Sequence, residues 1–219
     1  EARLLITQAK DGGQTIYENC GINVPGTALN LPAVTAEDEK LLEATVSFAS
    51  LVEVSFVRTA QDMRDAVAMV RRVEQRSGRN VGIVVKLETL ESMQNLPDIL
   101  LELMKHERVG VMVARGDMAA ELGIMHMVEA PRYVVNLCQA AQLPVIIGSN
   151  ILETLTDAGQ PTRAEVTDAA WAQQAECVML NHGKHMVETV EAVGALLSAM
   201  DGVQRKNQSL LPSLHEWKR

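Results

Sequence analysis

The sequence predicts an α/β domain with a parallel sheet, and three observations support this fold class. Five short runs rich in Val, Ile and Leu alternate with segments whose apolar residues recur at helical spacing. Each run is nearly continuous in apolar residues, as in strands that are buried on both faces. The 219 residues are 47% hydrophobic, which is enough for a sizeable aliphatic core. The alternation is compatible with either a doubly wound sheet or a (β/α)₈ barrel.

The expected elements follow one another along the chain. The first strand is expected at 52–57, and a helix follows over 60–78, where Gly78 ends it. The later strands are expected at 81–87, 109–115, 143–149 and 176–181. The later helices are expected at 92–106, in the region that follows residue 115 and runs to 141, at 163–174 and at 186–200. Before them, Asp11, Gly12 and Gly13 between two apolar segments predict a hairpin, and the Pro- and Gly-rich residues 24–32 predict a connector.

Composition excludes several classes of partner and compartment. The net charge of −8 and the pI near 5.2 disfavour nucleic acid and anionic membrane surfaces, since both require clustered Lys and Arg. Cys20, Cys138 and Cys177 are odd in number and far apart, so we expect reduced thiols in a cytoplasmic protein. No apolar run has the length of a membrane span. The first residue is Glu and not Met, which favours a fragment.

Polar residues end two neighbouring strands, where ligands of parallel α/β proteins bind. Lys86 and Glu88 are two residues apart, so their side chains share one face of a strand. Glu88 and Asp117, from adjacent strand tips, suit a hard divalent cation such as Mg²⁺. Lys86 would then supply positive charge to a phosphoryl group or an enolate. Gly116 would let a substrate carboxylate approach backbone N–H groups.

The same residues also have structural interpretations. A Lys and a Glu two apart on a strand often form a simple ion pair, and an Asp after a Gly is often a helix N-cap. The tripeptide Arg115, Gly116 and Asp117 could also suggest cell adhesion, but it follows a buried strand and not an exposed loop tip. The pattern alone does not decide between a metal site and these structural roles.

Several motifs in one order resemble the barrel domain of pyruvate kinases. They are NVPGTALNLPAVTAEDE, VSFVRTAQD, VVKLET, VMVARGDMAAELG, VIIGSNILETL, PTRAEVTDAA and CVMLN, and they cover roughly Gly21 to Val193. The resemblance implies a (β/α)₈ TIM barrel of the phosphoenolpyruvate/pyruvate type, with this chain carrying about its last five β/α units. It also implies that residues 1–21 are the return hairpin of an inserted β lid domain, residues 22–201 the C-terminal part of the barrel, and residues 202–219 a polar tail.

The resemblance also implies a reaction and a set of site residues. The reaction is glycolytic phosphoryl transfer between phosphoenolpyruvate and ADP, giving pyruvate and ATP, with Mg²⁺ or Mn²⁺ and with K⁺. Lys86 matches the lysine that stabilises the transferring phosphoryl group, and Glu88 and Asp117 match the metal ligands. Gly116 and Asp117 match the contact to the substrate carboxylate, and Ser149 takes the position of a threonine beside the enolate. A homo-oligomer without nucleic-acid or membrane partners is implied as well.

Departures from the family pattern leave two alternatives open. Cys20 stands where the family has a basic residue, Ala119 replaces a glycine, and residues 181–184 read NHGK in place of SGET. One alternative is a Mg²⁺-dependent pyruvate-enolate lyase or aldolase on the same barrel, and the other is a non-catalytic paralogue. The first three barrel units are expected to precede Glu1, so this stretch alone is expected to be inactive. A short form lacking the C-terminal regulatory domain, and unresponsive to sugar phosphates, is also expected.

Overall fold

The computed structural model describes residues 5–9, 11–13, 15–18, 22–27 and 30–201. The strands are β1 (Leu51–Val54), β2 (Gly82–Leu87), β3 (Val109–Ala114), β4 (Val145–Gly148) and β5 (Cys177–Val178). The helices are α1 (Ala36–Thr45), α2 (Ala60–Ser77), α3 (Leu90–Gln94), α4 (Leu96–Leu103), α5 (Arg115–Leu122), the 3₁₀ helix η1 (Ile124–Val128), α6 (Ala130–Ala140), α7 (Glu153–Ala158), α8 (Arg163–Ala172) and α9 (Met186–Asp201).

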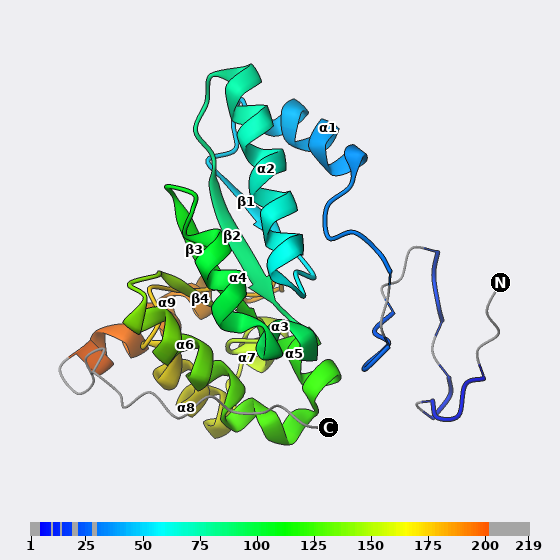
Figure 1. The fold of residues 1–219 in the computed structure, drawn as a ribbon. Coiled ribbons are helices and arrows are strands. Elements are labelled where there is room, and N and C mark those ends of the chain that lie inside the picture. Colours follow the sequence, from blue (N-terminus) through cyan, green and yellow to red (C-terminus); the bar gives the residue numbers. More distant parts are fainter. Residues whose placement is uncertain (1–4, 10, 14, 19–21, 28–29, 202–219) are drawn as a thin grey trace.

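All five strands form one parallel sheet in the sequential order β1-β2-β3-β4-β5. Val54 pairs with Val85, and Ala114 pairs with Gly148. Helices connect each strand to the next, and α2 and α4 lie on the same side of the sheet (Figure 1). The predicted α/β fold with a parallel sheet is therefore confirmed, and the strand order within the described part has no reversal of the kind that defines a doubly wound sheet.

The core lies between the sheet and the helices. In β2, Ile83, Val85 and Leu87 are fully buried in the same hydrophobic core as the apolar face of α2. Because side chains alternate along a strand, Val84 and Lys86 project from the opposite face. The carboxyl end of β2 thus presents Lys86 away from the helices.

Local sequence accounts for the ends of α2. Thr59 caps its first turn, since its hydroxyl accepts the Asp62 N–H while the Asp62 carboxylate accepts the Thr59 N–H. Gly78 follows the last turn with φ of 69°, a left-handed conformation that glycine adopts without steric cost. The predicted end of this helix at Gly78 is confirmed.

The clearest differences from the sequence prediction concern three elements. The first strand ends at Val54 and not at residue 57, because Phe56 has a left-handed φ of 54° that breaks the extended backbone. The helix expected at 92–106 begins earlier, at Leu90, and is divided at Asn95, beside a proline in the first turn of α4. The last strand is Cys177–Val178 only.

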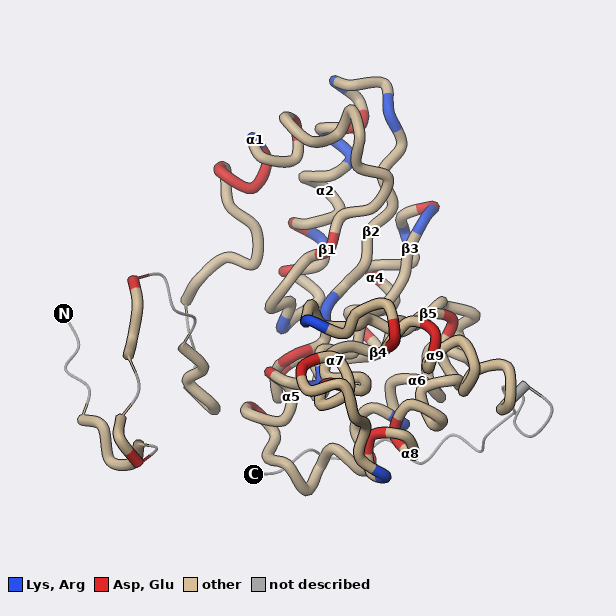
Figure 2. Tube along the Cα trace, turned by 180° about the vertical axis from the view of Figure 1, so that it is seen from behind, with Lys and Arg blue, Asp and Glu red and all other residues tan. Residues whose placement is uncertain are grey.

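Two helices were not predicted. Helix α1 begins after Thr35, whose capping box with Asp38 starts it, and its first turn is acidic (Figure 2). Helix α7 has six residues, too few for apolar periodicity to reveal it.

The predicted N-terminal hairpin is not formed among the described residues. Asp11 and Gly12 lie in a turn, but none of the described residues in 5–18 belongs to a strand, and the segment lies away from the sheet (Figure 1). Ile6 and Ile16 are 68% and 69% exposed, so no second layer covers them, and an isolated two-stranded hairpin is marginal in water. Cys20 and the tail at 202–219 lie outside the described residues. No described helix is both long and apolar enough to cross a bilayer.

Candidate active site

Lys86 and Glu88 lie side by side at the carboxyl end of β2. Lys86 Nζ is 2.9 Å from Glu88 Oε1, and the Glu88 side chain is fully buried while 21% of the Lys86 side chain is exposed. Burying an ion pair costs free energy unless further hydrogen bonds satisfy both groups. The two residues therefore form an ion pair, and it is buried and not solvated.

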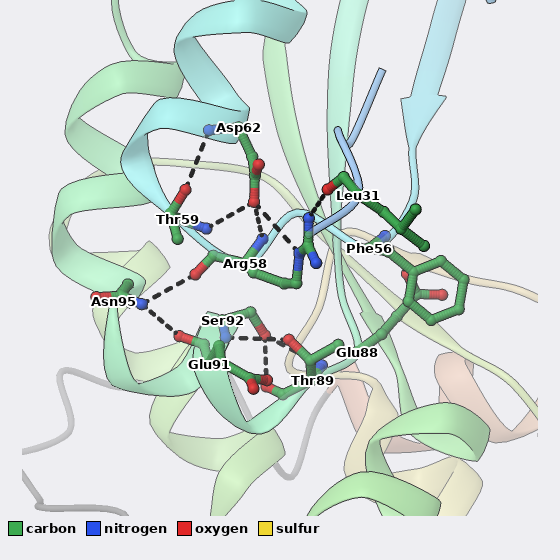
Figure 3. A network of polar contacts seen from close by, with 10 residues as sticks. All are labelled: Leu31, Phe56, Arg58, Thr59, Asp62, Glu88, Thr89, Glu91, Ser92 and Asn95. Atoms are coloured by element: carbon green, nitrogen blue, oxygen red, sulfur yellow. Dashed lines mark hydrogen bonds and ion pairs between the residues drawn. The ribbon is translucent and has the colours of Figure 1, made fainter. Parts of the chain in front are cut away.

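Two consecutive residues after β1 supply those hydrogen bonds. The backbone N–H of Phe56 donates to Glu88 Oε2 over 2.7 Å, and Figure 3 shows the two residues at the ends of neighbouring strands. Lys86 Nζ donates to Ser55 Oγ over 3.2 Å. The sequence did not identify either residue, because the apolar run at 52–57 predicts a strand and not a turn at Phe56. The positive φ of a bulky residue is strain of the kind that gathers at functional sites.

A hydrogen-bonded network holds this turn in place (Figure 3). The Arg58 guanidinium donates to the carbonyl of Leu31 and lies 3.6 Å from Asp62 Oδ2. Asn95 Nδ2 donates to the Arg58 carbonyl over 3.0 Å. The loop after β1 is thereby tied to the connector before α1 and to the start of α4.

The two oxygens of Glu88 have different partners. Oε1 is buried and lies 2.9 Å from the Lys86 ammonium, its ion-pair partner. A carboxylate oxygen can bind more than one cation, and a hard divalent cation takes one or two protein carboxylates and completes its shell with water and substrate. In the described part of the chain, no three His, Cys, Asp or Glu side chains gather into a larger metal cluster. Glu88 therefore suits Mg²⁺ or Mn²⁺.

Asp117 lies in the first turn of α5, directly after β3. Residue Ala114 is the N-cap of this helix and makes no side-chain cap, so the interpretation of Asp117 as an N-cap is wrong. Asp117 is half-buried, and its Oδ1 accepts a hydrogen bond from Asn23 Nδ2 over 3.3 Å. Helices α3, which follows Glu88, and α5 contact one another. Asp117 thus lies at the carboxyl end of β3, next to the end of β2 where Lys86 and Glu88 lie.

Gly116 and Ser149 come together from the ends of β3 and β4. A Cβ atom at Gly116 would lie 3.2 Å from Ser149 Oγ, so glycine permits this close approach. Arg115 joins the same two ends, because Nη2 donates to the Ser149 carbonyl and Nη1 to both carboxylate oxygens of Asp168, each over 2.7 Å. Sequence reasoning missed the Arg115–Asp168 pair, which joins residues far apart along the chain.

The loop after β4 is hydrogen-bonded to the segment that follows β5. The backbone N–H of Asn150 donates to Asn181 Oδ1 over 3.2 Å, and Asn150 Nδ2 donates to Glu153 Oε2 over 2.6 Å. Asn181 belongs to the NHGK segment that departs from the family pattern, and it contacts the residue directly after Ser149.

Several residues of the site border two cavities. One, of about 580 Å³, is lined by Asn23, Ser55 and Phe56 among others. The other, of about 950 Å³, is lined by Arg115, Gly116 and Ser149 among others. Lys86, Glu88 and Asp117 line neither cavity.

Comparison with known proteins gives a consistent result. The profile of the family described as "Pyruvate kinase, barrel domain" matches residues 1–190. The chain is 36% identical over 184 residues to pyruvate kinase of Leishmania mexicana, covering 81% of this chain and 35% of that protein. It is 37% identical over 169 residues to pyruvate kinase of Kluyveromyces lactis, covering 76% of this chain and 32% of that protein. The chain thus spans about a third of the length of these relatives.

Proposed function

Because this chain belongs to the pyruvate kinase family, we propose that it forms part of a phosphotransferase that converts phosphoenolpyruvate and ADP to pyruvate and ATP. The observation that carries this proposal is the buried Lys86–Glu88 ion pair at the carboxyl end of β2. A lysine and a carboxylate held in this way supply a fixed cation and a metal ligand in one place.

Each residue has a role that its surroundings support. Glu88 and Asp117 would hold Mg²⁺ or Mn²⁺, which when bound supplies positive charge to the phosphoryl and enolate oxygens. The Lys86 ammonium would lie against the transferring phosphoryl group and offset its developing charge. Ser149 would place its hydroxyl beside the enolate.

Gly116 is proposed to admit the substrate carboxylate. The first N–H groups of a helix lack partners within the helix, and α5 has no side-chain cap at its start. Gly116 is exposed, so an anion can approach these N–H groups without meeting a side chain. Orientation of the substrate in this way lowers the entropic cost of in-line transfer.

The surrounding architecture is proposed on the same basis. We propose that the five-stranded sheet is an arc of a (β/α)₈ barrel, which its sequential parallel order supports, and that further units of the protein close the barrel. Residues 1–21 would be the return of a lid domain. K⁺ as a second cation, a homo-oligomeric state and a cytoplasmic location are part of the proposal.

A lactate dehydrogenase-coupled assay on the full-length protein tests the function. Pyruvate should form from phosphoenolpyruvate only when both ADP and Mg²⁺ are present, and Lys86→Gln should abolish its formation. A full-length protein that binds Mg²⁺ and oxalate, a stand-in for the enolate, yet forms no ATP would contradict phosphoryl transfer. Binding of neither ligand would point to a non-catalytic protein.

A further inference from the structure

One peptide group beside the candidate substrate site is hydrogen-bonded at both of its polar ends. It joins Ser149 to Asn150, directly after β4. Arg115 Nη2, from the start of α5, donates to its carbonyl oxygen over 2.7 Å. Its N–H donates to Asn181 Oδ1, from the segment after β5, over 3.2 Å. Side chains from two other strand ends therefore fix the orientation of this peptide group.

The backbone at this peptide group is unusual and depends on such support. Asn150 has a left-handed φ of 61°, a conformation that a residue other than glycine adopts at a cost in free energy. Asn150 is also exposed, so packing against the core does not hold it in place. Its side chain adds a third hydrogen bond, from Nδ2 to Glu153 Oε2 over 2.6 Å. The conformation of this loop is thus determined by its hydrogen bonds.

The orientation of the peptide group determines where the Ser149 hydroxyl lies. The held carbonyl is bonded directly to the Ser149 Cα, so rotation of the peptide group displaces the side chain. Ser149 is half-buried and lines the cavity of about 950 Å³ together with Gly116. A Cβ atom at Gly116 would lie 3.2 Å from Ser149 Oγ, so this hydroxyl lies against the backbone that is proposed to receive the substrate carboxylate.

From this geometry we propose that Asn181 is a positioning residue, which holds the Ser149–Asn150 peptide group and thereby the Ser149 hydroxyl beside the enolate. The inference rests on the proposed function, in which Ser149 lies next to the enolate. It assigns a role to one residue of the NHGK segment, which departs from the family pattern. This role is exerted through Ser149 and not through contact with the substrate.

Loss of the Asn181 side chain should affect the enolate and little else. In Asn181→Ala the Asn150 N–H loses its acceptor, and the peptide group can rotate about the remaining bond to Arg115. Water can satisfy the freed N–H because Asn150 is exposed, so thermal stability should change little. Glu88 and Asp117 lie at other strand ends, so the affinity for Mn²⁺ should stay that of the wild type.

Exchange of the methyl protons of pyruvate in D₂O, followed by NMR, reports on the enolate directly. A methyl C–H bond breaks, its proton passes to solvent, and the enolate takes up a deuteron. The full-length protein should catalyse this exchange with Mg²⁺ and with inorganic phosphate in the place of the transferring group. Ser149→Ala should slow it about a hundredfold and Asn181→Ala about tenfold. In the double variant, Asn181→Ala should add little, because both changes act on the same hydroxyl.

His182→Ala is the matched control, because it truncates the exposed neighbour of Asn181 and should exchange at the wild-type rate. Wild-type exchange in Asn181→Ala would overturn the inference and leave the proposed function standing. A tenfold effect that persists in the Ser149→Ala background would also overturn it, as would an equal loss of Mn²⁺ affinity or of thermal stability. A wild type that neither catalyses exchange nor forms pyruvate from phosphoenolpyruvate and ADP would overturn the proposed function itself, and the inference with it.

Discussion

The backbone N–H of Phe56 donates to Glu88 Oε2 over 2.7 Å, and this bond joins the tips of β1 and β2. Phe56 has a left-handed backbone, at φ of 54°, and the residue is 47% exposed. At position 56 it is therefore the main chain that contacts Glu88. Glycine would reach the same backbone conformation without steric cost.

Phe56→Gly should keep the affinity for Mn²⁺. The N–H that fixes Glu88 is retained, and relief of the positive φ offsets the loss of a half-exposed ring, so the free energy of unfolding should stay within about 1 kcal/mol of the wild type. Urea unfolding and Mn²⁺ titration of the full-length protein measure the two effects. A large loss of metal affinity would show that the ring, and not the N–H, supports the site.

Glu88→Gln should weaken Mn²⁺ binding at least tenfold while shifting thermal unfolding by only a few degrees. The amide oxygen can still accept the Phe56 N–H, but the neutral group loses the charge that binds the cation. Asp117→Asn, at a half-buried position, should behave in the same direction. If both variants lose stability as strongly as metal affinity, the two carboxylates are structural.

Arg115→Lys should destabilise the protein by about 2 kcal/mol and lower kcat. Lysine keeps the charge but cannot bond Asp168 and the Ser149 carbonyl together through two separate nitrogens. The Arg115 side chain is 14% exposed, so water does not replace the lost bonds easily. Urea unfolding combined with the coupled assay separates the two effects, and Arg132→Lys, at a more peripheral arginine stacked on Trp171, is the comparison. An Arg115→Lys protein with wild-type stability would refute the bracing role.

The hydrophobic pattern of the sequence was sufficient to predict the repeated strand and helix units. Alternating apolar runs and helical spacing predicted five parallel strands along the chain, and Gly78 predicted the end of α2. The period of two along a strand predicted that Lys86 and Glu88 share a face, and their atoms lie 2.9 Å apart.

The remainder depends on contacts that local pattern does not encode. Ser55 and Phe56 lie within an apolar run, and a left-handed Phe is not expected from its bulk. The Arg115–Asp168 and Asn150–Asn181 contacts join segments distant in the chain, which periodicity within one element cannot reveal. Such residues become visible only when the sheet brings the strand ends together.

A pH dependence of stability is expected from the contact between α1 and α2. Glu39 of α1 accepts hydrogen bonds from Arg72 and Arg76 of α2, and these bonds, that of Arg72 foremost, lower the pKa of Glu39 from 4.5 to about 2. A carboxyl whose pKa is lower in the folded than in the unfolded state stabilises the fold above its unfolded pKa. This stabilisation should therefore be present above about pH 4.5 and be lost as the pH falls towards 2.

Glu39→Gln tests this expectation in thermal unfolding measured from neutral pH down to pH 2. The variant should melt below the wild type at neutral pH, and the difference in Tm should shrink between pH 4.5 and 2, where the wild-type carboxyl also becomes neutral. Glu37→Gln is the control, because Glu37 pairs at 3.3 Å with Lys40 where both side chains are about 70% exposed. Such surface pairs contribute little. A Tm difference for Glu39→Gln that stays constant across this range would show that the charge of Glu39 does not tie α1 to α2.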